Sequence, residues 1–239
     1  MKRNFIFPLI IAISASALLL SSCNKEKEDD GPMFYSYMTA VVPGVGEYPY
    51  YLITDDSLRL DPINHKETIF TDKIKMNDRF LGTVQVPNYN PDDKNGKVEH
   101  MKVKVMTLSP IYSSEIIRTE RTDTLGNNGV LNPTGWICGG IDGTARFLNF
   151  KFMVNTSKFN ITHMIYLVDQ FMDDPIDEEG YYQLQLYHNQ NHDPEDFMAE
   201  VVVSFTIPDG IYNKAKAEKG FKIIYRNMNN NTLSMTVDL

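Results

Sequence analysis

Cysteine is scarce in this sequence, because Cys23 and Cys138 are the only two among 239 residues. If Cys23 serves as an attachment point, no internal disulfide can form, and the fold must rest on apolar burial. Basic residues are also few, with 23 Lys and Arg against 31 Asp and Glu and a formal net charge of −8. An acidic chain without a basic patch repels phosphate backbones, which excludes nucleic acid as a partner.

The signature motifs of the common enzymes are missing too. The sequence contains no Gly-Xaa-Ser-Xaa-Gly elbow, phosphate-binding glycine loop or His-Glu-Xaa-Xaa-His helix. His188 and His192 lie four residues apart, but Pro194 follows closely, so a polar turn is favoured over a zinc site. We therefore predict no catalytic residue, no cofactor and no metal. A glycosidase needs only two carboxylates brought together by the fold, so a surface glycoside hydrolase or a carbohydrate-binding lipoprotein remains the alternative.

The first 23 residues have the pattern of a bacterial lipoprotein signal. Lys2 and Arg3 precede an apolar run over residues 5–20, and Leu20-Ser21-Ser22-Cys23 follows. The run is shorter than the roughly 20 apolar residues that cross a bilayer, which argues against an uncleaved anchor. A plain signal peptide is the other alternative. We predict a signal peptide over residues 1–22 and lipid attachment, including palmitate, at Cys23.

A polar segment, residues 23–33, follows the predicted cleavage site. It is rich in charge and ends in a Gly-Pro break, which is typical of a disordered tether. Lys27-Glu28-Asp29 is similar to the signal that sends lipoproteins of one group of Gram-negative gut bacteria to the cell exterior. We expect a lipid anchor in the outer membrane, with the protein facing outward.

The rest of the chain has the period of β-strands. Apolar and polar residues alternate in several stretches, which places one side of each strand inward. Turn residues rather than helical crossovers fill the gaps, which predicts antiparallel pairing. Only residues 211–219 offer helix formers, or else an irregular insertion. The predicted fold is all-β, with strands at 34–42, 48–54, 79–86, 100–108, 111–118, near 136, 147–154, 163–168, 181–188, 200–207, 221–226 and 232–239.

A change of composition divides these strands into two groups. Five strands over residues 34–120 suit a small OB-like barrel. Residues 121–133 are polar and aperiodic, which indicates a junction. About seven strands over residues 134–239 suit a β-sandwich, and we expect removal of the last seven residues to unfold it.

The order of several short motifs resembles that of the NigD-like lipoproteins. The matching segments are the lipobox and tether, Thr39-Ala40-Val41-Val42, Tyr50 to Ser57, Asp123-Thr124-Leu125-Gly126, Trp136-Ile137-Cys138-Gly139-Gly140, Phe147-Leu148-Asn149-Phe150, His163 to Val168 and Gly180 to Asn189. The resemblance implies an N-terminal OB-like domain and a C-terminal β-sandwich. The family takes its name from a gene of a bacteriocin cluster, which implies immunity or export support. One departure is the insertion of residues 141–145, which predicts a longer hairpin.

Aromatic residues provide the candidate binding surface. Tyr35, Tyr37 and Tyr48 lie in the first strands, where exposed rings stack on ligands, although packing alone also favours aromatics in strands. We therefore predict a non-catalytic envelope lipoprotein that binds a protein or glycan, either another envelope component or a secreted molecule. Ser57 and Thr124, each after an Asp and before a Leu, are candidate O-glycan acceptors.

Overall fold

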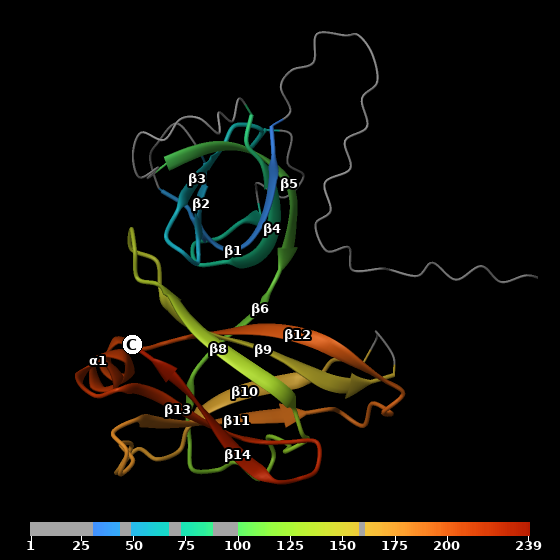
Figure 1. Ribbon diagram of the computed structural model, residues 1–239, viewed down its shortest axis with the longest axis vertical. Helices are drawn as coiled ribbons and strands as arrows, with labels where there is room; N and C mark the ends of the chain where they lie inside the picture. Colours follow the sequence, from blue (N-terminus) through green and yellow to red (C-terminus); the bar gives the residue numbers. More distant parts are fainter. Residues whose placement is uncertain (1–30, 44–48, 67–72, 88–99, 158–160) are drawn as a thin grey trace, which may run out of the picture.

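A computed structural model describes residues 31–43, 49–66, 73–87, 100–157 and 161–239. Two β modules follow one another along the chain, a small barrel and a larger sandwich (Figure 1). The predicted all-β class, a small barrel followed by a sandwich, is confirmed.

The barrel closes in the order β1-β2-β3-β5-β4, a Greek-key order in which β5 returns to lie beside β3. Apolar side chains on its inner face, including Met38, Leu52 and Val103, form a separate core. This is the OB-like barrel that the sequence predicts. Its strands are β1 (Met33–Val41), β2 (Tyr51–Thr54), β3 (Arg59–Pro62), β4 (Arg79–Gln85) and β5 (His100–Pro110).

The sandwich packs a five-stranded sheet, β14-β13-β11-β10-β7, against a four-stranded sheet, β6-β12-β9-β8. Its core includes Phe150, Phe152 and Phe205, all almost fully buried. The strands are β6 (Tyr112–Glu115), β7 (Ile117–Arg118), β8 (Leu131–Gly139), β9 (Arg146–Thr156), β10 (Met164–Asp169), β11 (Tyr182–Asn189), β12 (Phe197–Thr206), β13 (Gly220–Arg226) and β14 (Thr232–Asp238).

The helix α1 (Asp209–Ala217) lies where the sequence offers helix formers. Ile211 and Ala215, four residues apart, are buried on its inner face and pack into the sandwich core. The helix ends just before Gly220, whose φ of 125° favours glycine, and β13 starts at once. Because β12 and α1 intervene in the chain, β13 is able to return parallel to β11.

The boundary between the modules differs from the predicted one. Residues 111–118 alternate as a barrel strand would, yet β6 pairs with β12 and β7 pairs with β10, so both belong to the sandwich. The fifth barrel strand is instead Arg59–Pro62, which has too little alternation to be recognised. The polar passage at 121–133 lies within the sandwich, because Val130 bridges to Asn227 and β8 begins at Leu131.

Pairing also departs from a purely antiparallel arrangement. Four neighbouring pairs are parallel, namely β3 with β5, β6 with β12, β7 with β10, and β11 with β13. Parallel pairing needs a long connection between the strands, and each of these pairs is separated by other elements of the chain. Side-chain alternation along single strands carries no information on the direction of their partners.

Candidate functional site

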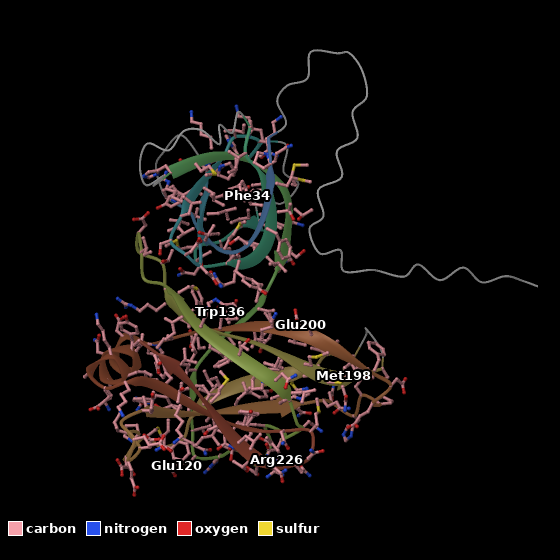
Figure 2. All side chains as sticks on the ribbon, in the orientation of Figure 1. Phe34, Glu120, Trp136, Met198, Glu200 and Arg226 are labelled. Carbon is pink, nitrogen blue, oxygen red and sulfur yellow. The ribbon has the colours of Figure 1, made fainter. Side chains whose placement is uncertain are left out.

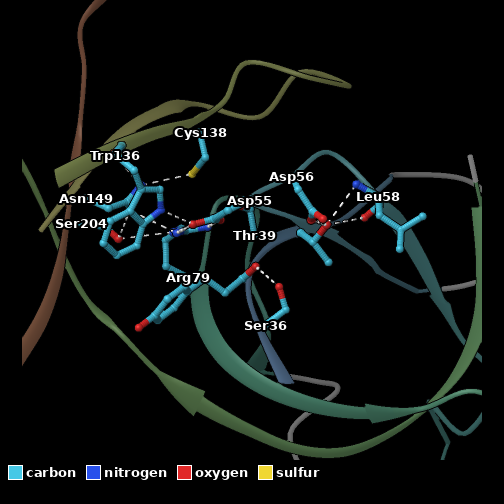
Figure 3. Close-up of polar contacts among 12 residues, drawn as sticks. Ser36, Thr39, Asp55, Asp56, Leu58, Arg79, Trp136, Cys138, Asn149 and Ser204 are labelled. Carbon is cyan, nitrogen blue, oxygen red and sulfur yellow. Dashed lines mark hydrogen bonds and ion pairs between the residues drawn. The ribbon is translucent and has the colours of Figure 1, made fainter. Parts of the chain in front are cut away.

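A buried arginine joins the two modules. Arg79 begins β4 in the barrel, and its side chain has no exposed surface. Its Nη1 and Nη2 donate to the two carboxylate oxygens of Asp55, at 2.5 and 2.8 Å. Nη1 also donates to Thr39, while Nε and Nη2 reach Ser204 (3.3 Å) and Asn149 (3.1 Å) in the sandwich. The guanidinium therefore uses all five donors, and two of them cross the domain boundary (Figure 3).

Asp55 also receives a bond from the sandwich, because Trp136 Nε1 donates to its Oδ2 at 2.6 Å. Burial acts to raise the pKa of Asp55, but the hydrogen bonds and charge of Arg79, with the Trp136 bond, outweigh it and lower that pKa. Asp55 therefore stays ionised at neutral pH. The carboxylate and the guanidinium form a charged pair that both modules complete.

The sandwich side of this cluster is equally satisfied. Ser204 donates to Asn149 Oδ1 at 2.6 Å, and Asn149 Nδ2 donates to the Trp136 carbonyl and contacts Cys138 Sγ. Burial raises the pKa of the Cys138 thiol to about 12. A thiol that stays protonated is a poor nucleophile. Cys138 is buried and packs as a small apolar residue. The cluster therefore links the barrel to the sandwich through these hydrogen bonds.

The inserted hairpin between β8 and β9 makes a second contact with the barrel. Asp142 and Gly143 both have positive φ, as in a two-residue hairpin turn, and Thr144 closes the turn on Ile141. Tyr51 donates its hydroxyl to Asp142 (3.3 Å), and Ala145 donates its amide to Asn77 (2.8 Å). Figure 1 shows the hairpin rising from the sandwich to the side of the barrel. The insertion noted in the sequence is thus an interdomain contact.

The tyrosines of the first two strands differ in their exposure to solvent. Tyr50 points into the barrel core and Tyr51 is 7% exposed, so neither is able to stack on a ligand. Tyr48 lies outside the described residues. Tyr35 is 68% exposed, whereas Tyr37, two residues along the same side of β1, packs against Trp136 with ring centroids 5.1 Å apart.

Tyr37 lies next to the outer face of the sheet that carries β9 and β12, and Tyr35 lies two residues before it on β1. Lys151 and Glu200 on that face form an ion pair (3.3 Å) and act electrostatically on Tyr37, as does Tyr35. Burial is the main cause that raises the pKa of Tyr37. We call these five residues, Tyr35, Tyr37, Trp136, Lys151 and Glu200, the corner surface. Figure 2 shows Trp136 at the junction of the modules and Glu200 further along β12.

A small pocket adjoins the corner surface at the open end of the barrel. Phe34 and Tyr35 line it together with Leu58, Met101 and Asp56, and its volume is about 200 Å³. Phe34 is 42% exposed and Met33 65%, so apolar surface continues along the start of β1. Aromatic rings around a small pocket with a single carboxylate nearby are typical of a surface that anchors a partner's side chain.

The sequence of the sandwich identifies the protein family. Residues 113–239 match the model of the NigD-like C-terminal β-sandwich domain, which spans β6 through β14 apart from the first residue of β6. The chain belongs to the NigD-like family. The match begins at β6 rather than at residue 134, in agreement with the domain boundary in the structure.

Solved structures share the arrangement of the NigD-like modules. A putative toxin-related protein from Parabacteroides distasonis has 21% identity and a TM-score of 0.60, covering 86% of this chain and 94% of its own. A putative lipoprotein from Bacteroides fragilis has 9% identity and a TM-score of 0.62, covering 87% and 98%. A NigD-like immunity protein from Bacteroides caccae has 15% identity and a TM-score of 0.51, covering 86% and 92%. At these identities the likeness concerns the fold, and no curated protein sequence matches significantly.

A second polar cluster lies at the far end of the NigD-like sandwich. Asp193 accepts bonds from Thr156, Ser157 and His163, and His163 Nδ1 lies 3.0 Å from His188 Nε2. Burial, and then the charge of His163, lower the pKa of His188 to about 4. For Asp193, burial opposes the shift, but hydrogen bonds led by that of Ser157 lower its pKa. Within the described ranges no group of three or more His, Cys, Asp or Glu residues suits a metal ion.

Of the remaining predicted sites, two are exposed on the surface and one lies outside the residues that the structure describes. Ser57 is exposed in the turn after β2, with a φ of 74°, and Thr124 is exposed in the turn at 123–125. Both residues are exposed, and their modification stays a prediction. Cys23 and the tether up to residue 30 lie outside the described residues. In the part that is described, no helix is long and apolar enough to span a membrane.

Sequence reasoning missed the residues that join the modules. Nothing in the sequence marks Arg79 and Asp55 as buried, because charged residues at the ends of strands are usually exposed to solvent. Asn149 is the residue that the sequence could have marked. An asparagine among Phe147, Leu148 and Phe150 is unusual in a strand that is buried on both sides, and it indicates a buried hydrogen bond. Lys151 and Glu200 became candidates only when the register paired β9 with β12.

Proposed function

We propose that this NigD-like protein is a lipid-anchored, non-catalytic binding protein of the bacterial envelope, and that the corner surface contacts a protein partner. The observation that carries the proposal is the grouping of Tyr35, Tyr37 and Trp136 with the Lys151–Glu200 pair across the domain boundary. Aromatic anchors surrounded by charged groups are the residues that dominate protein–protein binding energy. The Arg79 cluster keeps the two halves of this surface in register.

Immunity-type binding is the physiological role that we favour. One related structure is described as a NigD-like immunity protein and another as a putative toxin-related protein. An immunity protein acts by binding and needs no reactive group. Neither Asp55 nor Asp193 suits the general-acid role of a glycosidase, because the pKa values of both are lowered, whereas a general acid requires a raised one.

Site-specific photo-crosslinking in the source cells tests the corner surface. A benzophenone amino acid replaces Tyr35, which is 68% exposed, and in a control replaces Leu233, which is 44% exposed on the other sheet. We expect a defined protein adduct from position 35 that is absent at position 233 and weakened by Glu200→Ala. Equal adducts at both positions, or none at 35, would overturn the assignment of this surface.

The lipid anchor has its own test. Metabolic labelling with a palmitate analogue should label the wild-type protein, and Cys23→Ala should abolish the label and retain the leader. An unlabelled wild-type protein contradicts the anchor without affecting the corner surface. Intact-mass measurement of the native protein tests the sugars at Ser57 and Thr124 in the same preparation.

A further inference from the structure

The strand β12 is covered along only half of one edge. On one side it pairs with β9 over its whole length, from Phe197 to Thr206. On the other side β6 pairs only with residues 203–206, where Tyr112 lies opposite Val203 and Glu115 opposite Thr206. Among the described residues, none forms a strand beside residues 198–202 on that side.

The path of the chain explains why β6 stops there. The chain descends from the barrel through β5, and Ile111 donates its amide to the carbonyl of Arg79 at 2.9 Å. This bond holds Ile111 against the barrel, so the segment joins the sandwich sheet only from Tyr112 onward. The interdomain junction therefore prevents β6 from extending beside residues 198–202.

The uncovered edge presents backbone groups that face outward. Ile207 donates its amide to the carbonyl of Arg146, which places residue 207 on the β9 side. The register between β12 and β9 shifts nowhere, and the bonding direction alternates along a strand. Met198 and Glu200 therefore direct their N–H and C=O groups away from β9, and Val202 directs its N–H there, while its C=O faces Tyr112 at the start of β6. Such groups on a sheet edge are the template for an added strand.

Side chains around this edge define what an added strand would meet. On the inner face Val201 is partly buried and packs against the sandwich core, so apolar side chains suit that side. On the outer face Met198 is 39% exposed, and the Glu200 side chain is 57% exposed. Glu200 occupies the centre of the edge. Its carboxylate pairs with Lys151 of β9 at 3.3 Å and is the acidic group that an added strand would meet.

We propose that residues 198–202 of β12 bind an extended segment of a partner protein by strand addition, with a basic residue opposite Glu200 and apolar residues facing Val201. The inference rests on the proposed function and deepens it, since it supplies the mode by which a protein partner engages the strand edge that contains Glu200 of the corner surface. Backbone bonds give affinity in this mode, and the alternating side chains give specificity.

Charge argues against a second copy as the occupant. Antiparallel pairing of two identical edges that uses all five residues from 198 to 202 must be centred on Glu200. The two copies of Glu200 would then lie directly opposite each other, and like charges in that position destabilise a sheet. A charged residue in an exposed edge is a common protection against self-association. The same charge favours a partner that carries Lys or Arg.

The test uses two synthetic pentapeptides, acetyl-Thr-Val-Lys-Val-Thr-amide and its counterpart with Glu in place of Lys, titrated into the ¹⁵N-labelled mature protein. We expect the Lys peptide to shift the amide signals of Met198, Glu200 and Val202 and to bind about threefold more tightly than the Glu peptide. In Glu200→Lys the preference should reverse. This exchange follows from the edge geometry and does not depend on the photo-crosslinking result at Tyr35.

A proline variant separates backbone pairing from side-chain contact. Val202→Pro removes one outward N–H without removing a bond to β9, and edge strands tolerate proline. It should lose peptide binding, while Val202→Ala, which keeps the N–H, should retain it. If Val202→Pro does not fold, the reversal of peptide preference in Glu200→Lys tests the proposal without it. The proposal is overturned by unshifted edge amides at millimolar peptide, by the same peptide preference in Glu200→Lys, or by self-association of the wild type at these amides.

Discussion

Replacing Arg79 with methionine should separate the two modules energetically. The change leaves the Asp55 carboxylate, only 14% exposed, without its cation, and it removes the donors to Thr39, Asn149 and Ser204. Removal of one partner from a buried ion pair typically costs about 3 to 5 kcal/mol. We expect a loss of that size in the free energy of unfolding at neutral pH.

Urea denaturation followed by tryptophan fluorescence measures this loss at the junction itself. Trp136 is the only tryptophan in the chain, and its indole N–H bonds to Asp55. Lys151→Met is the control, because that lysine belongs to an exposed pair with Glu200 and should cost less than about 1 kcal/mol. If Arg79→Met costs no more than Lys151→Met, the cluster does not hold the modules together.

A double variant and the pH dependence refine the result. Arg79→Met combined with Asp55→Asn removes both charges, so its cost should be at least about 1 kcal/mol smaller than the two single costs added together. Because the folded-state pKa of Asp55 is lowered, its contribution is complete above the ordinary pKa and is lost as the pH falls through the folded value. Arg79→Met should lose this component of acid sensitivity.

Three further predictions concern the sandwich and the hairpin. The folded-state pKa of His188 is lowered to about 4, so the wild type should keep its stability above pH 6.5 and lose about 2 kcal/mol by pH 5 relative to His188→Gln, measured by urea denaturation. Gly139→Ala places a Cβ 2.1 Å from the Ala145 carbonyl and should lower the melting temperature more than Gly143→Ala, whose Cβ meets open space at a similar positive φ; equal losses would contradict this. Cys138 should resist a maleimide at pH 8 in the folded state and react in urea, because its thiol is buried with a pKa of about 12.

Strand content and family were accessible from the sequence because both depend on local patterns. Alternation in residues 201–207 and 233–237 predicts β12 and β14, and both strands lie there. The fifth barrel strand, Arg59–Pro62, was not found, since four residues with Arg, Asp and Pro lack a period. Residues 111–118 have the period but pair with β12 and β10, and a period gives no information about partners.

The candidate site was predicted only in part. The sequence identified Tyr35 and Tyr37 by their aromatic character, and the structure places both on β1 of the barrel. Exposure separates them, because Tyr37 packs on Trp136 from a strand almost 100 residues away. Lys151 and Glu200 join the surface through the register of β9 with β12, a relation between residues about 50 positions apart.

The sequence by itself determined that this chain forms strands and that it is acidic, and it predicts a lipoprotein signal in the first residues, since each of these depends on neighbouring residues. The tertiary structure decided how Arg79 and Asp55 meet Asn149 and Ser204, and which half of the β12 edge β6 leaves uncovered. These features depend on long-range pairing and on the angle between two modules. The buried polar groups are satisfied only when segments that are distant in the chain come together, so no single segment predicts the cluster.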